Sequence, residues 1–523
     1  MPFRPILAGL LLGTATPLCA EPEAARPGPA RFEQRLVAIM NAGGTADTIQ
    51  GRLGRIGADP SLTVDQRLAV DALRTLVRSR SKPKGLSLAE AEAFAARNPD
   101  SPAAAFLIAE AALANDQAQR SADILIAASA RAGPLVQLVS PATVSKLTSE
   151  LDTLSDKDRT AELGKALLEA GWDRGSAGLR SYLAMAAIRQ AVETQRLDEA
   201  RRLLSAVESP ASLYLILIDN RLAPLRDEVI QAAGPRLERA WQQYLSSTRN
   251  DWLERGDVLS ATAFAEALKQ ANLHGELAGA FLARFMRGYN CSTDLVARSV
   301  GADLADSLFK IGRWAKAEDV MRRSGGVSPP VYAAMLLERG EFGRAASLFE
   351  RSLRTADPPK ELDERKAAAW LHVASACAFF RSGNRAPSLP HDLKLLDVSA
   401  RLFVLLCLER RADAQVALLS ALADEEERAD ALRWIQPFVD PAAQSRFRTE
   451  MSGRIRELQR DPQVIAEASR VGVILEWPLT SSVPGRNLWA DGKAAAAWQC
   501  GDQADWETGP AAAPMAYLPD SDP

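Results

Sequence analysis

Two segments of the chain carry the same short pattern, Gly312-Arg-Trp314-Ala-Lys-Ala317 and Gly340-Glu-Phe342-Gly-Arg-Ala345. In each, an aromatic residue stands two positions after a glycine, and an alanine stands three positions after the aromatic residue. The positions on either side match as well, pairing Ala305 with Ala333, Leu308 with Leu336 and Met321 with Phe349. A glycine relieves the backbone strain of a tight turn, and a small residue lets two helix axes approach closely. The pattern therefore predicts two helix-turn-helix hairpins.

Weaker copies of the pattern occur earlier in the chain. They are Gln117-Ala-Gln119-Arg-Ser-Ala122, Gln195-Arg-Leu197-Asp-Glu-Ala200 and Gly256-Asp-Val258-Leu-Ser-Ala261. Between all of these copies, apolar residues recur at spacings of three and four, and short clusters rich in proline, glycine and asparagine interrupt them. This periodicity predicts helices over residues 31–470 with no strands.

The repeated hairpin resembles the tetratricopeptide repeat, clearly over residues 301–359 and in part over residues 99–268. The best two copies are 28 residues apart, whereas that repeat has a period of about 34 residues. Glutamine also replaces glycine in two copies. The resemblance implies an all-α fold, an elongated α-solenoid of stacked helical hairpins with an extended curved surface.

Composition agrees with a folded chain and argues against nucleic-acid binding. Of 523 residues, 47% are hydrophobic and 25% are charged, and the formal net charge is only -3. Proteins that bind nucleic acids usually carry a basic patch or a high isoelectric point.

The N-terminus has the features of a secretory signal peptide over residues 1–20. Arg4 supplies the positive charge, residues 6–12 form a short apolar run, and small residues lead to a predicted cleavage site after Ala20. Leu18 precedes Cys19, which disfavours lipidation, so we expect Cys19 to leave with the signal. Residues 21–30 contain three prolines and are predicted to be a linker. We expect the mature chain to be periplasmic or otherwise exported, with no membrane-spanning segment.

Four cysteines remain in the predicted mature chain. Cys377 and Cys407 lie in apolar helical segments, and we expect them to pack as small hydrophobic side chains rather than to form a bridge. For Cys291 and Cys500 the sequence gives no preference.

The helical pattern ends at Val471, and the last residues differ in composition. Residues 471–500 are predicted to be an irregular capping segment, and residues 501–523, which contain five acidic residues and no Lys or Arg, a disordered acidic tail. Trp489 and Trp498 are predicted to cap the last repeat. Trp506 is a candidate anchor for a partner protein.

Motifs that indicate catalysis, metal binding or cofactor binding are weak in this chain. His274, His372 and His391 are far apart, and the apolar surroundings of His372 predict a buried, packed side chain. The glycines at 51–57 follow no strand, and Ser79 and Lys82 lack the other motifs of serine acylases. We therefore expect no enzymatic activity, metal or cofactor.

Export, helical repeats and weak catalytic motifs together favour a scaffold or adaptor that binds a peptide segment or another cell-envelope protein in a helical groove. Two alternatives remain open. One is an enzyme that acts on cell-wall glycan through paired carboxylates dispersed along the groove. The other is a structural spacer without a specific partner.

Overall fold

A computed structural model of the chain describes residues 29–41, 46–80, 87–255, 258–288, 294–323, 329–355, 362–384, 391–440, 445–480 and 488. The predicted signal peptide, Trp489, Trp498, Trp506 and the acidic tail lie outside the described residues. So do Cys291 and Cys500.

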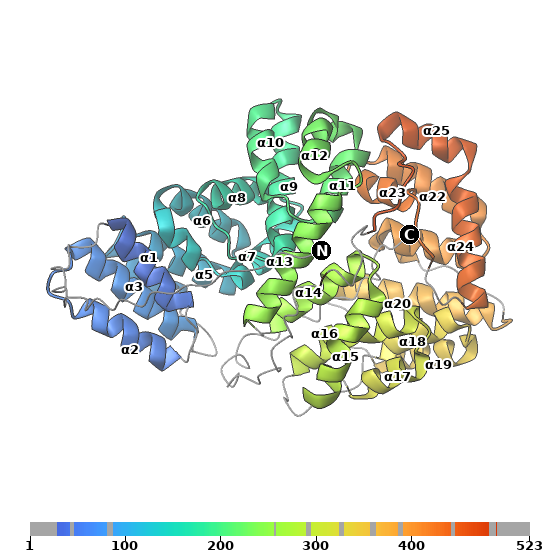
Figure 1. Cartoon of the computed structure of the whole chain (residues 1–523), viewed down its shortest axis with the longest axis horizontal. Coiled ribbons are helices and arrows are strands. Elements are labelled where there is room, and N and C mark those ends of the chain that lie inside the picture. Colours follow the sequence, from blue (N-terminus) through green and yellow to red (C-terminus); the bar gives the residue numbers. More distant parts are fainter. Residues whose placement is uncertain are drawn as a thin grey trace, which may run out of the picture.

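Twenty-five α-helices lie in the described residues, and most of them pack against their neighbours in sequence. The first eight form an arm at one end of the molecule (Figure 1). Its helices are α1 (Pro29–Asn41), α2 (Ala46–Gly57), α3 (Val64–Arg80), α4 (Leu88–Ala96), α5 (Pro102–Ala114), α6 (Ala118–Ala132), α7 (Pro141–Thr153) and α8 (Lys157–Glu169), with the 3-10 helix η1 (Gly133–Leu138) after α6.

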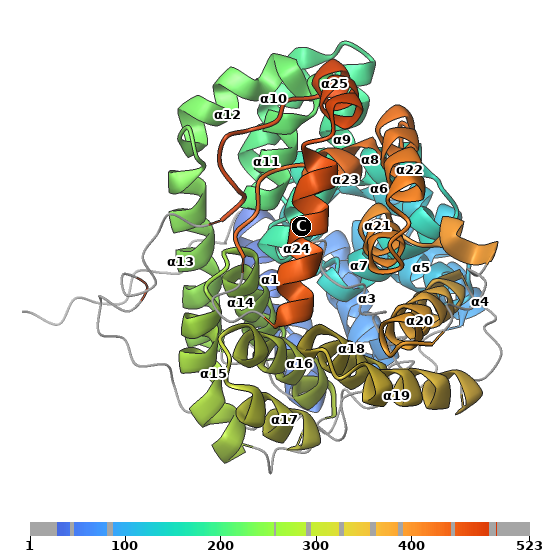
Figure 2. The same cartoon turned by 90° about the vertical axis from the view of Figure 1, so that its right-hand side faces the viewer.

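The remaining helices are arranged around a ring, which Figure 2 shows from the end opposite the arm. The first half of the ring contains α9 (Ala177–Glu193), α10 (Leu197–Leu203), η2 (Leu204–Ala206), α11 (Pro210–Ile218), η3 (Asn220–Leu225), α12 (Arg226–Ala233), α13 (Glu238–Arg255), α14 (Val258–Gln270), α15 (His274–Gly288) and α16 (Asp294–Lys310). The second half contains α17 (Trp314–Arg323), α18 (Pro329–Arg339), α19 (Phe342–Thr355), α20 (Leu362–Arg381), η4 (His391–Leu395), α21 (Val398–Cys407), α22 (Arg411–Ala423), α23 (Arg428–Trp434), α24 (Arg446–Gln459) and α25 (Pro462–Val471).

One tight turn recurs between helices and explains the repeated sequence pattern. At Gly312 and Gly340 the backbone has positive φ angles of 77° and 86°. The next residue donates its N–H to the carbonyl five positions back, Arg313 to Leu308 and Glu341 to Leu336, both at 2.8 Å. This is the Schellman ending of a helix, and here the following helix begins at once.

The same turn occurs at five residues that are not glycine. They are Asp116, Ser155, Gln195, Asn272 and Glu409, with φ angles of 55–61°. Asp116, Ser155 and Gln195 are 39 and 40 residues apart, so the hairpin period in this region is longer than the 28 residues between the two glycine copies. The register predicted for the first weak copy is therefore wrong by one position, because the turn residue is Asp116 and not Gln117.

Ser121 takes the place of the small alanine in that copy. It is fully buried and donates a hydrogen bond from Oγ to the carbonyl of Ala109 at 2.8 Å, which ties α6 to α5. The turn at Gly256 lies outside the described residues, although Ala261 beyond it is fully buried.

Side chains link each hairpin of the arm to the next. Arg159 pairs with Asp123 at 2.8 Å, and the indole nitrogen of Trp172 donates to the carbonyl of Val139 at 3.0 Å. These partners are 36 and 33 residues apart, which is about one hairpin. Contacts between adjacent hairpins thus hold this part of the arm, and α1 also packs against η1, which lies more than 90 residues later in the chain.

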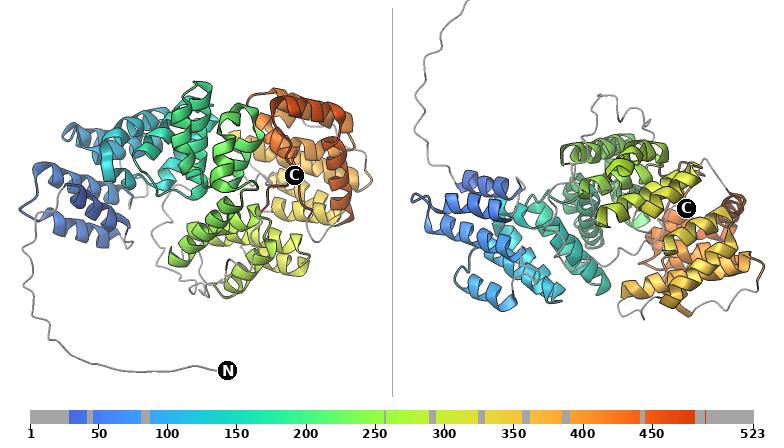
Figure 3. Two further views of the ribbon diagram at one scale, coloured as in Figure 1. Left: turned by 45° about the horizontal axis from the view of Figure 1, so that its top comes forward. Right: turned by 90° about the horizontal axis from the view of Figure 1, so that it is seen from below.

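The ring differs because its C-terminal helices return to its first ones. In the described residues the chain has a single extended pairing, an antiparallel bridge between Asp219, which follows α11, and Gly472, which follows α25. The buried side chains form two clusters, one from residues 32–183 and one from residues 177–488. In the described residues the chain is all-α, as predicted, and its helices pack mainly with their sequence neighbours, but those of the ring close on themselves (Figure 3).

Candidate functional site

The segment Ser445–Thr480, here called the strap, lies across the ring and joins parts of the chain that are far apart in sequence. Its first half is α24, which crosses in front of the ring in Figure 2. Its second half contains α25 and the extended residues 472–480. The strap is the best candidate for a functional element, because in it the surfaces of the ring hold a helix and an extended segment of the same chain.

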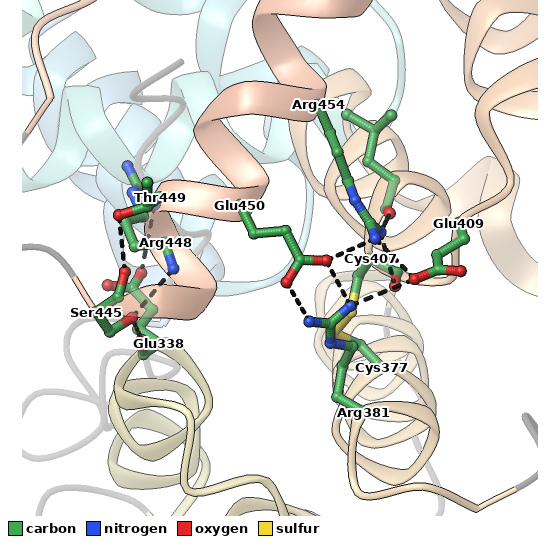
Figure 4. Close-up of polar contacts among 11 residues, drawn as sticks. Glu338, Cys377, Arg381, Cys407, Glu409, Ser445, Arg448, Thr449, Glu450 and Arg454 are labelled. Carbon is green, nitrogen blue, oxygen red and sulfur yellow. Dashed lines mark hydrogen bonds and ion pairs between the residues drawn. A yellow bond between two sulfur atoms is a disulfide. The ribbon is translucent and has the colours of Figure 1, made fainter.

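α24 is held by polar groups of α20, of α21 and of the turn that follows α21 (Figure 4). The two terminal nitrogens of the Arg381 guanidinium pair with the carboxylate of Glu450, and Nη1 lies 2.8 Å from Oε1. Arg454 donates to Glu409 at 2.7 Å and to the carbonyl of Leu406 at 2.6 Å. The hydrogen bonds from Arg381 lower the pKa of Glu450, since they favour the charged carboxylate.

The start of α24 is fixed to α18. Ser445 caps the helix by accepting the N–H of Arg448 at 3.0 Å, and the same hydroxyl donates to the carbonyl of Glu338. The guanidinium of Arg448 lies 3.7 Å from the Glu338 carboxylate. Helix capping and ion pairing thus meet at the N-terminal end of α24.

A disulfide between Cys377 and Cys407 lies beneath this network and joins α20 to α21. Both cysteines are fully buried, and their Cα atoms are 5.8 Å apart. The expectation that they pack without bridging is therefore wrong, although both are buried as predicted. Arg381 follows Cys377 by one helical turn, and Glu409 stands two residues after Cys407, so the bridge joins the two helices that hold α24.

An aromatic cluster completes the surface that holds α24. This surface, formed by Glu338, Phe342, Arg381 and Glu409, is here called the dock. Phe342, the aromatic residue of the second repeat copy, meets Phe447 of α24 edge to face with ring centroids 5.3 Å apart. The Arg381 guanidinium lies 5.6 Å from the Phe342 centroid and 5.4 Å from that of Phe447. Such cation–π contacts are strongest when the pair is partly desolvated. The repeat motif thus supplies part of the strap-binding surface.

The second half of the strap is bound as an extended segment. Val473 donates its N–H to the carbonyl of Ile218 at 2.8 Å, and a β-carbon at Gly472 would lie 2.5 Å from that same carbonyl oxygen. Only glycine permits this close approach. Farther along, Trp477 packs edge to face on the ring of Tyr214, and the Tyr214 hydroxyl donates to the Trp477 carbonyl at 3.2 Å.

Two buried polar side chains complete the closure. Gln436 accepts the N–H of Leu475 at 2.9 Å and donates to the carbonyl of Val473 at 3.1 Å. Asp219 pairs with Arg221, which also donates to the carbonyl of Glu425 at 3.0 Å. Backbone N–H and C=O groups outside the helices therefore have hydrogen-bond partners in the closed ring.

A polar cluster elsewhere in the ring resembles a catalytic pair, but it is buried. Ser307 Oγ and His274 Nδ1 are 3.1 Å apart, and both residues are buried. Burial raises the pKa of Asp306 nearby, yet the positive charges of Lys310 and Lys269 outweigh that effect and the pKa lies below its ordinary value. Because Ser307 is fully buried, a substrate has no access to it, and we interpret the cluster as a structural link between α14, α15 and α16.

The repeat residues predicted from the sequence occupy the hairpin interfaces. The buried ones are Ala305, Leu308, Ala317, Ala333, Leu336, Ala345 and Phe349. Trp314 is half-buried, donates from its indole nitrogen to the carbonyl of Phe309 at 3.2 Å, and carries the Arg339 guanidinium 4.9 Å from its ring centroid. His372 is exposed, so the predicted burial of its side chain is wrong.

Little in the sequence indicated the strap residues. Glu450, Arg454 and Arg381 are charged residues on helices, and such residues are usually solvated. The sole useful signal was Gly472, which stands at the end of the helical pattern inside the apolar run Val471–Leu479.

No protein-family model, curated protein or solved structure matches this chain. None of the helices in the described ranges is both long and apolar enough to cross a membrane. In the same residues no group of three or more His, Cys, Asp and Glu side chains could hold a metal ion.

Proposed function

We propose that this protein is an exported scaffold or adaptor, a tetratricopeptide-repeat-like array that binds a segment of another cell-envelope protein. The observation that carries the proposal is the strap. Surfaces of the array hold one helix and one extended segment of the same chain, each through specific side chains and backbone groups. A surface with these properties suits polypeptide partners, because helix-in-groove and strand-addition contacts are the common modes of peptide recognition.

The cysteine pair supports the proposed compartment. Disulfides persist in oxidising compartments and are rare in the cytosol. The Cys377–Cys407 bridge is fully buried within the ring core, so it belongs to the fold and not to an exposed redox site. It therefore favours an exported chain, in agreement with the signal peptide predicted for residues 1–20.

The experiment that tests the proposal is crosslinking of the tagged protein in its native envelope, followed by mass spectrometry. Two matched variants run in parallel. One lacks residues 2–20, so that it stays in the cytoplasm and reports background, and the other ends at Gln499, so that it lacks Trp506 and the acidic tail. We expect one dominant partner that is absent from the cytoplasmic variant.

The truncated variant assigns the contact. Loss of the partner with the tail places the contact at Trp506, whereas a partner that remains is bound by the helical array. If no protein is enriched over the cytoplasmic variant, the adaptor proposal fails, and the spacer interpretation takes its place.

A further inference from the structure

The surface under α24 recognises a helix by a defined order of charges. The dock presents an acidic, a basic and an acidic side chain in succession, Glu338 from α18, Arg381 from α20 and Glu409 beyond α21. α24 presents the complementary order, Arg448, Glu450 and Arg454. Charge order of this kind fixes the direction and register of a bound helix.

The apolar part of α24 adds a second requirement. The buried side chains Phe447, Met451, Ile455 and Leu458 recur at spacings of four and three, so they lie on one face of the helix. Phe447 anchors this face against Phe342 and beneath Arg381. An occupant of the dock therefore needs an aromatic residue, arginine at the next position, glutamate three positions after the aromatic residue and arginine seven positions after it.

α24 is not optimised for permanent burial. Ser452 of α24 is only 2% exposed, and its hydroxyl has no hydrogen-bond partner among the described residues. An unpaired buried hydroxyl opposes docking. The side chains of Glu409 and Glu450 are 55% and 33% exposed, so solvent screening limits what their ion pairs add to stability.

We propose that the dock formed by Glu338, Phe342, Arg381 and Glu409 is the surface that binds the partner, and that the partner's contacting segment is an amphipathic helix with the charge order of α24. In this inference, which rests on the proposed adaptor function, α24 occupies the dock when the partner is absent. The partner's helix displaces it because both make the same contacts.

The probe for this inference is a fluorescein-labelled peptide of residues 445–460 of this chain. The receptor is the full chain with Phe447→Ala and Met451→Ala, which weaken its own α24 and leave every dock residue unchanged. A tethered α24 competes at an effective concentration in the millimolar range. We expect fluorescence polarisation to show binding to this variant at least tenfold tighter than to the wild-type chain.

Charge reversal tests the specificity of the contact. Glu409→Arg in the same receptor should abolish binding of the peptide, and a peptide with Arg454→Glu should restore it. A second receptor carries Glu450→Lys in place of the two alanine substitutions. The lysine repels Arg381 but leaves the apolar face of α24 intact. Binding can therefore be measured even if the double alanine variant does not fold. Ser452→Ala in the otherwise wild-type chain should weaken peptide binding, because α24 then docks more firmly.

Two results would overturn the inference. The first is peptide binding that is no tighter to the released receptors than to the wild-type chain, or that is insensitive to Glu409→Arg. The second is a partner, recovered by crosslinking, whose yield neither rises with Glu450→Lys nor falls when excess peptide is added. That second result leaves the adaptor proposal intact and places its contact elsewhere on the array.

Discussion

The arm and the ring are built from the same helical hairpins, yet different contacts hold them. In the arm, Arg159 reaches Asp123 and Trp172 reaches Val139, one hairpin away in each case. In the ring, Tyr214 binds Trp477 across 263 residues and Arg221 binds Glu425 across 204 residues. Repeats that mainly contact their neighbours can open locally, whereas a closed ring loses many contacts together. The arm should therefore unfold locally and the ring cooperatively.

The largest expected effect is loss of the disulfide. Replacing Cys377 and Cys407 by alanine frees a loop of about 30 residues, which should lower the free energy of unfolding of the ring by about 3–4 kcal/mol. The arm contains no part of this loop, so its stability should not change. Hydrogen exchange followed by mass spectrometry separates the two regions. Equal loss of protection in α5–α8 and in α20–α24 would contradict the division between arm and ring.

Two glycines give a matched comparison. A β-carbon at Gly472 would lie 2.5 Å from the carbonyl oxygen of Ile218, and one at Gly164 would lie 2.5 Å from that of Leu183. Each substitution by alanine should cost about 1–3 kcal/mol, because the backbone must move apart. Gly472→Ala should open α11 and α21–α25 together, whereas Gly164→Ala should affect only α8 and α9. Hydrogen exchange of the two variants measures the difference, with Gly453→Ala as control, since no atom lies within 4 Å of its added β-carbon.

The recurrent turn between helices predicts a smaller effect. Gly340 has a φ angle of 86°, and a β-carbon there would meet only the tip of Phe342 at 3.9 Å. Gly340→Ala should therefore cost about 1 kcal/mol through backbone strain alone. Gln195 already has a positive φ angle, so Gln195→Gly should relieve backbone strain. We expect the free energy of unfolding either to stay unchanged or to rise by less than about 1 kcal/mol. Denaturant melts of both variants test this, and a loss in Gln195→Gly as large as that in Gly340→Ala would show that side-chain contacts dominate the turn.

The smallest effect concerns the pH dependence of the strap. Hydrogen bonds from Arg381 lower the pKa of Glu450 below its ordinary value of 4.5 in the folded chain. Its stabilising contribution is therefore complete above about pH 4.5, and it is lost as the pH falls through the lower folded pKa. We expect Glu450→Gln to cost less than about 1 kcal/mol at pH 7, because the Glu450 side chain is 33% exposed and solvent partly screens its ion pairs. The difference in denaturation midpoint between this variant and the wild-type chain should vanish in acid, and a constant difference across pH 3–7 would contradict the role of the charge.

Much of the local structure followed from the sequence, since each hairpin depends on residues close together in the chain. The spacing of Gly312, Trp314 and Ala317 predicted a turn and a close helix contact, and the backbone has both. The sequence pattern did not predict the turns at Ser155, Asn272 and Glu409, because residues other than glycine can take the left-handed conformation when the helices on both sides impose it.

The candidate site was much less predictable. Cys377 and Cys407 were correctly expected to be buried, but burial alone does not show whether two sulfur atoms meet. Arg381 and Glu450 come from two separate helices and Glu409 from the turn after a third, and each would be an ordinary solvated charge on its own. Their partnership depends on how α24 crosses the ring.

The sequence by itself determined that the chain forms helices, where most of them break and which small residues lie between them, because these properties depend on neighbours within a few residues. Tertiary structure decided that the ring closes, that Val473 and Trp477 contact α11, and that two buried cysteines form a bridge. Those outcomes depend on contacts between residues 30 to 263 positions apart. Whether such contacts form depends on the angles between many successive hairpins taken together, and no local sequence pattern specifies that combined geometry.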